Sequence, residues 1–191
     1  MHFTVINTFT LKDAADAADF EVRFLSHVEW MRARPGFVAH QAVRSLEQPG
    51  VYVNFGWWQR PEDFQAVLAS DTFKAHAEEF HRIVDVTADP SFGVLRLDGT
   101  AAQEDDHLVV EYVTAGEGDD IAALYGRYAD ADGLVSVDLA KSLFARPGGY
   151  TALSRWRSAA QADAARATIV ERAEPARPIA GTRAELAPAG A

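Results

Sequence analysis

The chain has 191 residues, of which 48% are hydrophobic and 24% charged, a composition typical of globular proteins rather than of disordered or fibrous ones. It has no cysteine and a formal net charge of −10, which excludes disulfides and zinc–thiolate sites and argues against nucleic acids and anionic membranes as partners. Apolar runs are too short to span a bilayer and no secretory signal is visible, so we expect a cytoplasmic protein.

The first half of the chain reads as strand, helix, strand, strand, helix, strand. Strands are predicted from alternating or β-branched apolar residues at 3–9, 37–44, 51–58 and 92–97. The first helix carries apolar residues at helical spacing from Phe20 to Met31 and stops at Pro35-Gly36. Pro61 begins the second helix, and Asp71 begins a further helical piece.

The second half of the chain repeats this pattern. Gly36-Phe37-Val38 matches Gly133-Leu134-Val135, which lies 97 residues later, and Tyr52 and Trp58 recur 98 residues later with the same spacing. The corresponding elements are strands at 107–113, 134–144, 150–157 and 179–186, and helices at 119–129 and 159–170. The sequence therefore predicts an internal duplication.

Each predicted unit is a βαββαβ, ferredoxin-like arrangement of the α+β class. The polar segment 97–106 reads as a linker between a first repeat at 1–100 and a second at 107–187, followed by a disordered tail at 188–191. Because one such sheet leaves an apolar face uncovered, we expect the repeats to pack sheet to sheet as an intramolecular dimeric α+β barrel. The chain would then be a monomer with an internal pseudo-dimer, with edge strands still available for a homodimer.

Two asparagines in the predicted strands of the first repeat indicate a site. Strand alternation places Tyr52, Asn54 and Trp58 on one face. We expect the first and third strands to be parallel neighbours, which would bring Asn7 beside Asn54. Asparagine is depleted in strands and a buried amide needs hydrogen-bond partners, although a pair of satisfied structural amides is the alternative interpretation.

With these residues the sequence resembles the antibiotic biosynthesis monooxygenase family. The resemblance lies in Pro35-Gly36-Phe37, in the strand Val53-Asn54-Phe55-Gly56-Trp57-Trp58 and in the helix start Glu62-Asp63-Phe64. It covers residues 2–97 and, more weakly, 107–186. Cofactor-independent anthrone oxygenases of this family use an N-x-x-x-W pair on the third strand and, in some members, an asparagine on the first.

This resemblance implies oxidation of a polycyclic aromatic, an anthrone or phenol, to a quinone by O2, with no flavin, haem or metal. Its catalytic residues would be Asn7, Asn54 and Trp58, and the substrate-binding residues Tyr52, Phe24 and Phe64. The partners would be a small aromatic substrate and O2. Some members also use a histidine late in the second strand, where this chain has Val43, which argues against proton transfer by a histidine at that position.

The second repeat lacks this pattern. Ala152 stands where the first repeat has Asn54, and Glu111 or Tyr112 stands where it has Asn7. We therefore expect a single site, in the first repeat. A larger core in the first repeat is the alternative explanation.

Three other functions remain open from the sequence. A non-oxidative polyketide cyclase or isomerase would use the same barrel and neutral donors, and a non-enzymatic binding protein would use the same apolar site. The haem-degrading branch of the superfamily fits at Asn7, but Val67 and Ala77 stand where that branch has a tryptophan and a ligand histidine, with His76 one residue too early.

The remaining histidines show no metal-binding pattern. His27, His40, His76 and His81 lack the i, i+4 spacing of a helical metal pair and have no acidic partner completing a motif. We expect them to be solvated or to lie in the core.

Overall fold

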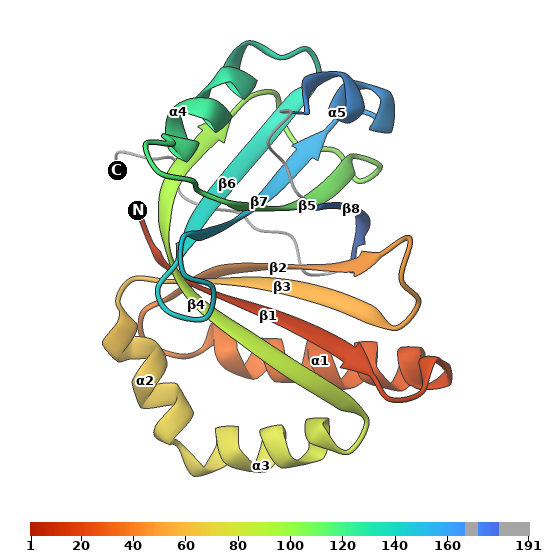
Figure 1. Ribbon diagram of the computed structural model, residues 1–191. Helices are drawn as coiled ribbons and strands as arrows, with labels where there is room; N and C mark the ends of the chain where they lie inside the picture. The colour runs from red at the N-terminus through yellow and green to blue at the C-terminus, as the bar shows by residue number, and fades with distance from the viewer. Residues whose placement is uncertain (167–171, 180–191) are drawn as a thin grey trace. The chain divides into compact units, whose positions relative to one another are not determined.

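The computed structural model describes residues 1–166 and 172–179 (Figure 1). Its strands are β1 (Phe3–Leu11), β2 (Phe37–Ser45), β3 (Val51–Trp58), β4 (Val84–Asp98), β5 (His107–Thr114), β6 (Leu134–Ser142), β7 (Gly149–Trp156) and β8 (Arg172–Pro178). Its α-helices are α1 (Ala17–Arg32), α2 (Pro61–Ala69), α3 (Asp71–His81), α4 (Ile121–Gly126) and α5 (Ala159–Ala165), and its 3-10 helices are η1 (Ala14–Asp16) and η2 (Arg127–Asp130).

The chain forms two compact units, built mainly from His2–Ala88 and from Asp89–Arg177, which we call the first and second repeat. Over the described residues the strands are hydrogen-bonded in the order β1-β3-β2-β8-β5-β7-β6-β4, a closed barrel. This confirms the predicted α+β barrel of two repeats. None of the helices in the described ranges has the length and apolar character needed to cross a membrane.

In the first repeat β3 lies between β1 and β2 and is antiparallel to both. The parallel pairing of the first and third strands expected from the sequence is therefore wrong. The crossover through α1 returns β2 in the direction of β1, and the tight turn after β2 reverses the chain into β3, which inserts between them. The register nevertheless places Asn7 directly opposite Asn54.

The helices of the first repeat cover one face of this sheet because α1 has a buried aromatic face. The ring of Phe20 on α1 lies 4.7 Å from that of Tyr52 on β3 and 5.4 Å from that of Phe9 on β1. Tyr52, Asn54 and Phe9 alternate with residues of the other face, so the side of the sheet that carries the two asparagines is the side that faces the helices.

The second repeat has the same register as the first. His107 pairs with Trp156 across β5 and β7, as Phe3 pairs with Trp58 across β1 and β3. Counting along these strands places Glu111, rather than Tyr112, at the position of Asn7. Glu111 lies opposite Ala152, as Asn7 lies opposite Asn54.

The C-terminal elements differ from the prediction. The structure has a strand that the sequence did not predict, β8 at Arg172–Pro178. The strand predicted at 179–186, apart from Ile179, and the predicted tail at 188–191 lie outside the described residues. Two prolines and three charged residues conceal this strand in the sequence, but alternate side chains, Glu174 and Ala176, are buried. The predicted helix at 159–170 ends at Ala165, with 167–170 outside the described residues, and the one at 119–129 is α4 followed by η2.

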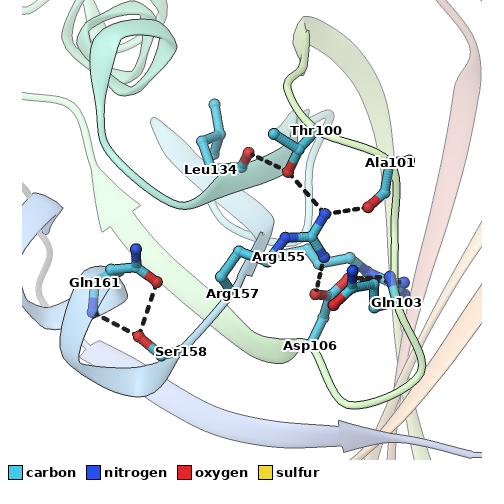
Figure 2. Close-up of polar contacts among 9 residues, drawn as sticks. All are labelled: Thr100, Ala101, Gln103, Asp106, Leu134, Arg155, Arg157, Ser158 and Gln161. Carbon is cyan, nitrogen blue, oxygen red and sulfur yellow. Dashed lines mark hydrogen bonds and ion pairs between the residues drawn. The ribbon is translucent and has the colours of Figure 1, made fainter.

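The segment between β4 and β5, expected to be a polar linker, is tied to the second repeat (Figure 2). Arg157 donates hydrogen bonds to the Asp106 carboxylate at 2.5 Å and to the Thr100 hydroxyl at 2.9 Å. It also donates to the carbonyl of Ala101. Asp106 in turn accepts from the backbone N–H of Gln103 at 2.7 Å, so this buried ion pair fixes the segment's path.

A tight turn before β2 depends on glycine at position 36. Gly36 has a φ of +74°, and a Cβ there would overlap the Asp63 side chain at the start of α2. Replacing Gly36 with Ala should therefore lower the free energy of unfolding by about 1–3 kcal/mol, measured by denaturant titration. The matched control is Gly126→Ala, because Gly126 has a φ of −55° and open space around its Cα. Equal stability of the two variants would contradict the prediction.

Candidate functional site

A row of polar side chains divides the helix-facing side of the first repeat into two hydrophobic clusters. One, the Phe20 cluster, comprises Phe9, Leu11, Phe20, Phe24, Val28, Ala42, Tyr52, Phe80, Val84 and Ile179. The other, the Trp58 cluster, comprises Phe3, Val5, Trp58 and Val67. Asn7 on β1 lies between Val5 and Phe9, and Asn54 lies between Tyr52 and Trp58 on β3. We call Asn7, Asn54 and His40 the polar row.

His40 joins the polar row from β2. Its Nδ1 forms a hydrogen bond of 3.3 Å with the Asn54 amide oxygen. Because that oxygen can only accept, Nδ1 carries the ring proton and Nε2 carries the lone pair. Within the described part of the chain, Nε2 is buried without a hydrogen-bond partner.

The environment of His40 keeps its imidazole neutral. The residue is 3% exposed and Asn54 is 9% exposed. Burial, together with the smaller effect of the charge of Arg32, lowers the pKa of His40 to about 4, although the hydrogen bond with Asn54 acts in the opposite direction. At pH 7 the polar row therefore presents an uncharged base beside an amide.

Two N–H donors converge above Gly56. The Trp58 indole Nε1 and the Asn54 Nδ2 lie 3.6 and 3.8 Å from the point where a Cβ on Gly56 would stand. The backbone carbonyl oxygen of Val5 also lies near them, 3.7 Å from the same point. Across β2 the neighbour of Gly56 is His40, so two donors and one base lie around a position without a side chain.

The other residues predicted for the site lie around this polar row. The Phe24 ring is 6.3 Å from His40, and the Phe64 ring is 5.4 Å from Trp58. Tyr52 shares the face of Asn54, but its hydroxyl donates to Glu21 at 3.0 Å, and burial raises the pKa of Tyr52 to about 12. The structure thus brings Asn7, Asn54 and Trp58 to one face, whereas the Tyr52 hydroxyl is bound elsewhere.

Sequence reasoning missed His40. It considered Val43, which pairs with Val53 and therefore lies on the opposite face. The residues of β2 that share the helix-facing side are those opposite Gly56, Asn54 and Tyr52, namely His40, Ala42 and Arg44. The alternation of side chains along β2 was the available signal. It shows which residues share the face of Asn54 only once the register between β2 and β3 is known.

Two histidines expected to be unremarkable form a pair between α1 and α3. The Nδ1 atoms of His27 and His76 lie 3.0 Å apart, flanked by the rings of Trp30 and Phe73. Burial, followed by the proximity of His76, lowers the pKa of His27 to about 4. No set of three or more possible metal ligands occurs within residues 1–166 and 172–179.

The pKa of His40 makes stability depend on pH. Between pH 6.5 and about 4, the unfolded chain binds a proton at His40 that the folded protein does not. Acidification through this range should therefore lower the free energy of unfolding by about 3 kcal/mol on account of His40. The free energy of unfolding of wild type and of His40→Gln is measured by urea titration at pH 7 and at pH 4.5. Because both proteins contain His27, its contribution cancels in the difference between them. Parallel pH profiles would contradict the prediction.

Comparison with known proteins finds a family match over the first part of the chain. Residues 2–79 match the family model described as antibiotic biosynthesis monooxygenase. None of the curated protein sequences matches the chain.

Solved structures share the fold over nearly the full chain. An anthrone oxidase-like protein is 16% identical with a TM-score of 0.71, covering 97% of both chains. A putative monooxygenase from Lactobacillus acidophilus NCFM is 9% identical with a TM-score of 0.71, covering 93% of both. A putative chlorite dismutase is 13% identical with a TM-score of 0.62, covering 92% of this chain and 94% of its own. At these identities the likeness concerns the fold.

The family match lies on the repeat that carries the polar row, as the sequence resemblance predicts, and it supports monooxygenase activity in general. Residues 2–79 therefore match an antibiotic biosynthesis monooxygenase domain, within a chain that shares its fold with an anthrone oxidase-like protein over nearly its whole length.

Proposed function

We propose that the first repeat is a cofactor-independent monooxygenase that oxidises a polycyclic phenol or anthrone to a quinone with O2. The observation that carries this proposal is that a buried neutral base, His40, lies beside the N–H donors of Asn54 and Trp58, between two apolar clusters. Such a site favours a flat aromatic substrate and stabilises negative charge that develops on its oxygen.

Proton removal starts the reaction. The buried Nε2 of His40 accepts a proton from the activated carbon or hydroxyl of the substrate, and the electron pair remains on the substrate as an enolate. The Asn54 amide and the Trp58 indole N–H groups donate to that oxyanion. Because both donors are neutral and fixed by β3, little reorganisation is required as the charge develops.

Oxygen then reacts with the enolate. One electron passes from the enolate to O2, and the resulting radical pair combines at carbon to form a peroxide. Loss of water from the peroxide leaves one oxygen atom in the product carbonyl and one in water, so that a CH2 group and O2 become C=O and H2O. The apolar clusters on either side exclude solvent from these intermediates.

Oxygen consumption separates this proposal from the alternatives. An anthrone that is consumed together with one equivalent of O2 supports the oxygenase. Conversion of a polyketide without O2 uptake would indicate a cyclase or isomerase, and binding without turnover would indicate a binding protein. The monomeric state, with an internal pseudo-dimer, stays a prediction. It is tested by measuring the molar mass in solution by light scattering.

Asn54 is expected to act in the transition state. Asn54→Ala should lower kcat for anthrone about 100-fold or more with little change in KM, because one oxyanion donor and the support of His40 are lost together. The control is Ala152→Ser at the equivalent position of the second repeat, which should keep normal turnover. The role fails if Asn54→Ala retains near-normal kcat.

His40 is expected to act as the base. His40→Gln should slow the oxidation of a weakly acidic anthrone at least about 100-fold. A substrate that is already ionised at the assay pH needs no base, so its kcat should fall much less in His40→Gln. The readout is the ratio of the two kcat values in each protein. An equal loss for both substrates would assign His40 a structural role instead.

A further inference from the structure

The two repeats can be aligned residue by residue at the end of their first helical segment. Gly36 and Gly133 both have positive φ, +74° and +79°. The hydrogen bond from the Arg34 N–H to the Met31 carbonyl recurs as one from Ala131 to Tyr128. With the matching strand registers, this places Tyr128 at the position of Met31.

The second repeat has other residues at the positions of the polar row. Val137 takes the place of His40, Ala152 that of Asn54, and Ser154 that of Gly56. The side chains on this face then form one continuous cluster among the described residues, namely Val109, Val113, Ile121, Tyr125, Tyr128, Leu134, Val137, Leu139, Ala152, Trp156 and Ala162. Glu111, at the position of Asn7, is the carboxylate left within it.

Tyr128 supplies the partner of that carboxylate. Its hydroxyl donates to Glu111 Oε1 at 3.0 Å, and the Ser154 hydroxyl donates to Oε2 at 2.8 Å. The Tyr128 ring lies 5.2 Å from the Trp156 ring at an interplanar angle of 77°. Tyr128 is 3% and Glu111 2% exposed. A phenol therefore lies edge to face with the tryptophan of this repeat, with its hydroxyl on the residue that replaces Asn7.

In the first repeat the position of Tyr128 is occupied by Met31. Met31 provides no hydroxyl, and Nε2 of His40 is buried without a hydrogen-bond partner among the described residues. In the second repeat Tyr125, whose ring lies 5.3 Å from that of Tyr128, also carries a buried hydroxyl without a partner in the described part of the chain. This is a second polar group that a ligand in place of Tyr128 would meet.

We infer that the second repeat is a phenol-binding site filled by the chain's own Tyr128, and that a phenolic ligand of the first repeat takes the equivalent place, edge-on to Trp58 with its hydroxyl toward Asn7. The second part rests on the proposed function of the first repeat. Tyr128 thus closes one of two related sites and shows how the open one orients its ligand.

The first test removes the Tyr128 side chain from the second repeat. Tyr128→Ala leaves a space the size of p-cresol beside Glu111 and Ser154, whereas Tyr128→Phe keeps the ring and serves as the control. At about 100 times its Kd, p-cresol should raise the Tm of Tyr128→Ala about 5 °C more than that of wild type or Tyr128→Phe. Toluene, which lacks the hydroxyl, should do much less. Equal stabilisation by toluene, or none by either compound, would overturn the inference for this repeat.

The second test introduces a tyrosine into the first repeat at the position equivalent to Tyr128. It does not depend on the folding of Tyr128→Ala. Met31→Tyr should weaken p-cresol binding at least about tenfold. Binding is measured by NMR titration, from the shift of the Trp58 indole N–H signal. The volume-matched variant Met31→Leu should bind p-cresol as wild type does. Undiminished binding by Met31→Tyr, or no binding by wild type, would overturn the inference for this repeat.

Both tests measure binding without turnover. A protein that binds p-cresol as described but consumes no O2 with anthrone would refute the oxygenase proposal alone. Turnover of anthrone with unaltered p-cresol binding in Met31→Tyr would refute the inference alone.

Discussion

The cost of removing polar groups from water governs the first repeat. An amide or imidazole buried without a full set of hydrogen bonds destabilises the folded state by about 1–3 kcal/mol. His40 and Asn54 share one hydrogen bond, and Nε2 of His40 has no partner among the described residues. A protein that retains such atoms between two apolar clusters gives up stability that a ligand with matching polar groups restores.

The same desolvation determines which chemistry is favoured. Burial keeps His40 neutral, so the site has a base without a resident positive charge. A charge created there by proton transfer is poorly screened and interacts strongly with the fixed N–H groups of Asn54 and Trp58. The polar row and the apolar clusters therefore act together, because the clusters exclude the water that would weaken each dipole.

Much of this arrangement could be read from the sequence, since it depends on alternation within single strands. Asn54 and Trp58 share a face for that reason, and Asn7 follows because the first and third strands of this fold are neighbours. What could not be read depends on pairing between strands. The prediction that β3 runs parallel to β1 was wrong. His40 was not predicted as a site residue because the face of the sheet on which it lies depends on its pairing with Gly56. The hydrogen bond between Tyr128 and Glu111 joins a helical turn to a strand with no local signal.

The register shared by the two repeats has a consequence for how the protein can change. In a symmetric homodimer every substitution appears twice, so a residue that fills one site fills both. Two copies joined in one chain escape this rule. Substitutions such as Ala152 for Asn54 and Val137 for His40 improve apolar packing in one copy while the other copy keeps its polar side chains. Fusion thus allows a divergence that symmetry forbids, in which one half has a continuous apolar interior and the other keeps buried polar side chains.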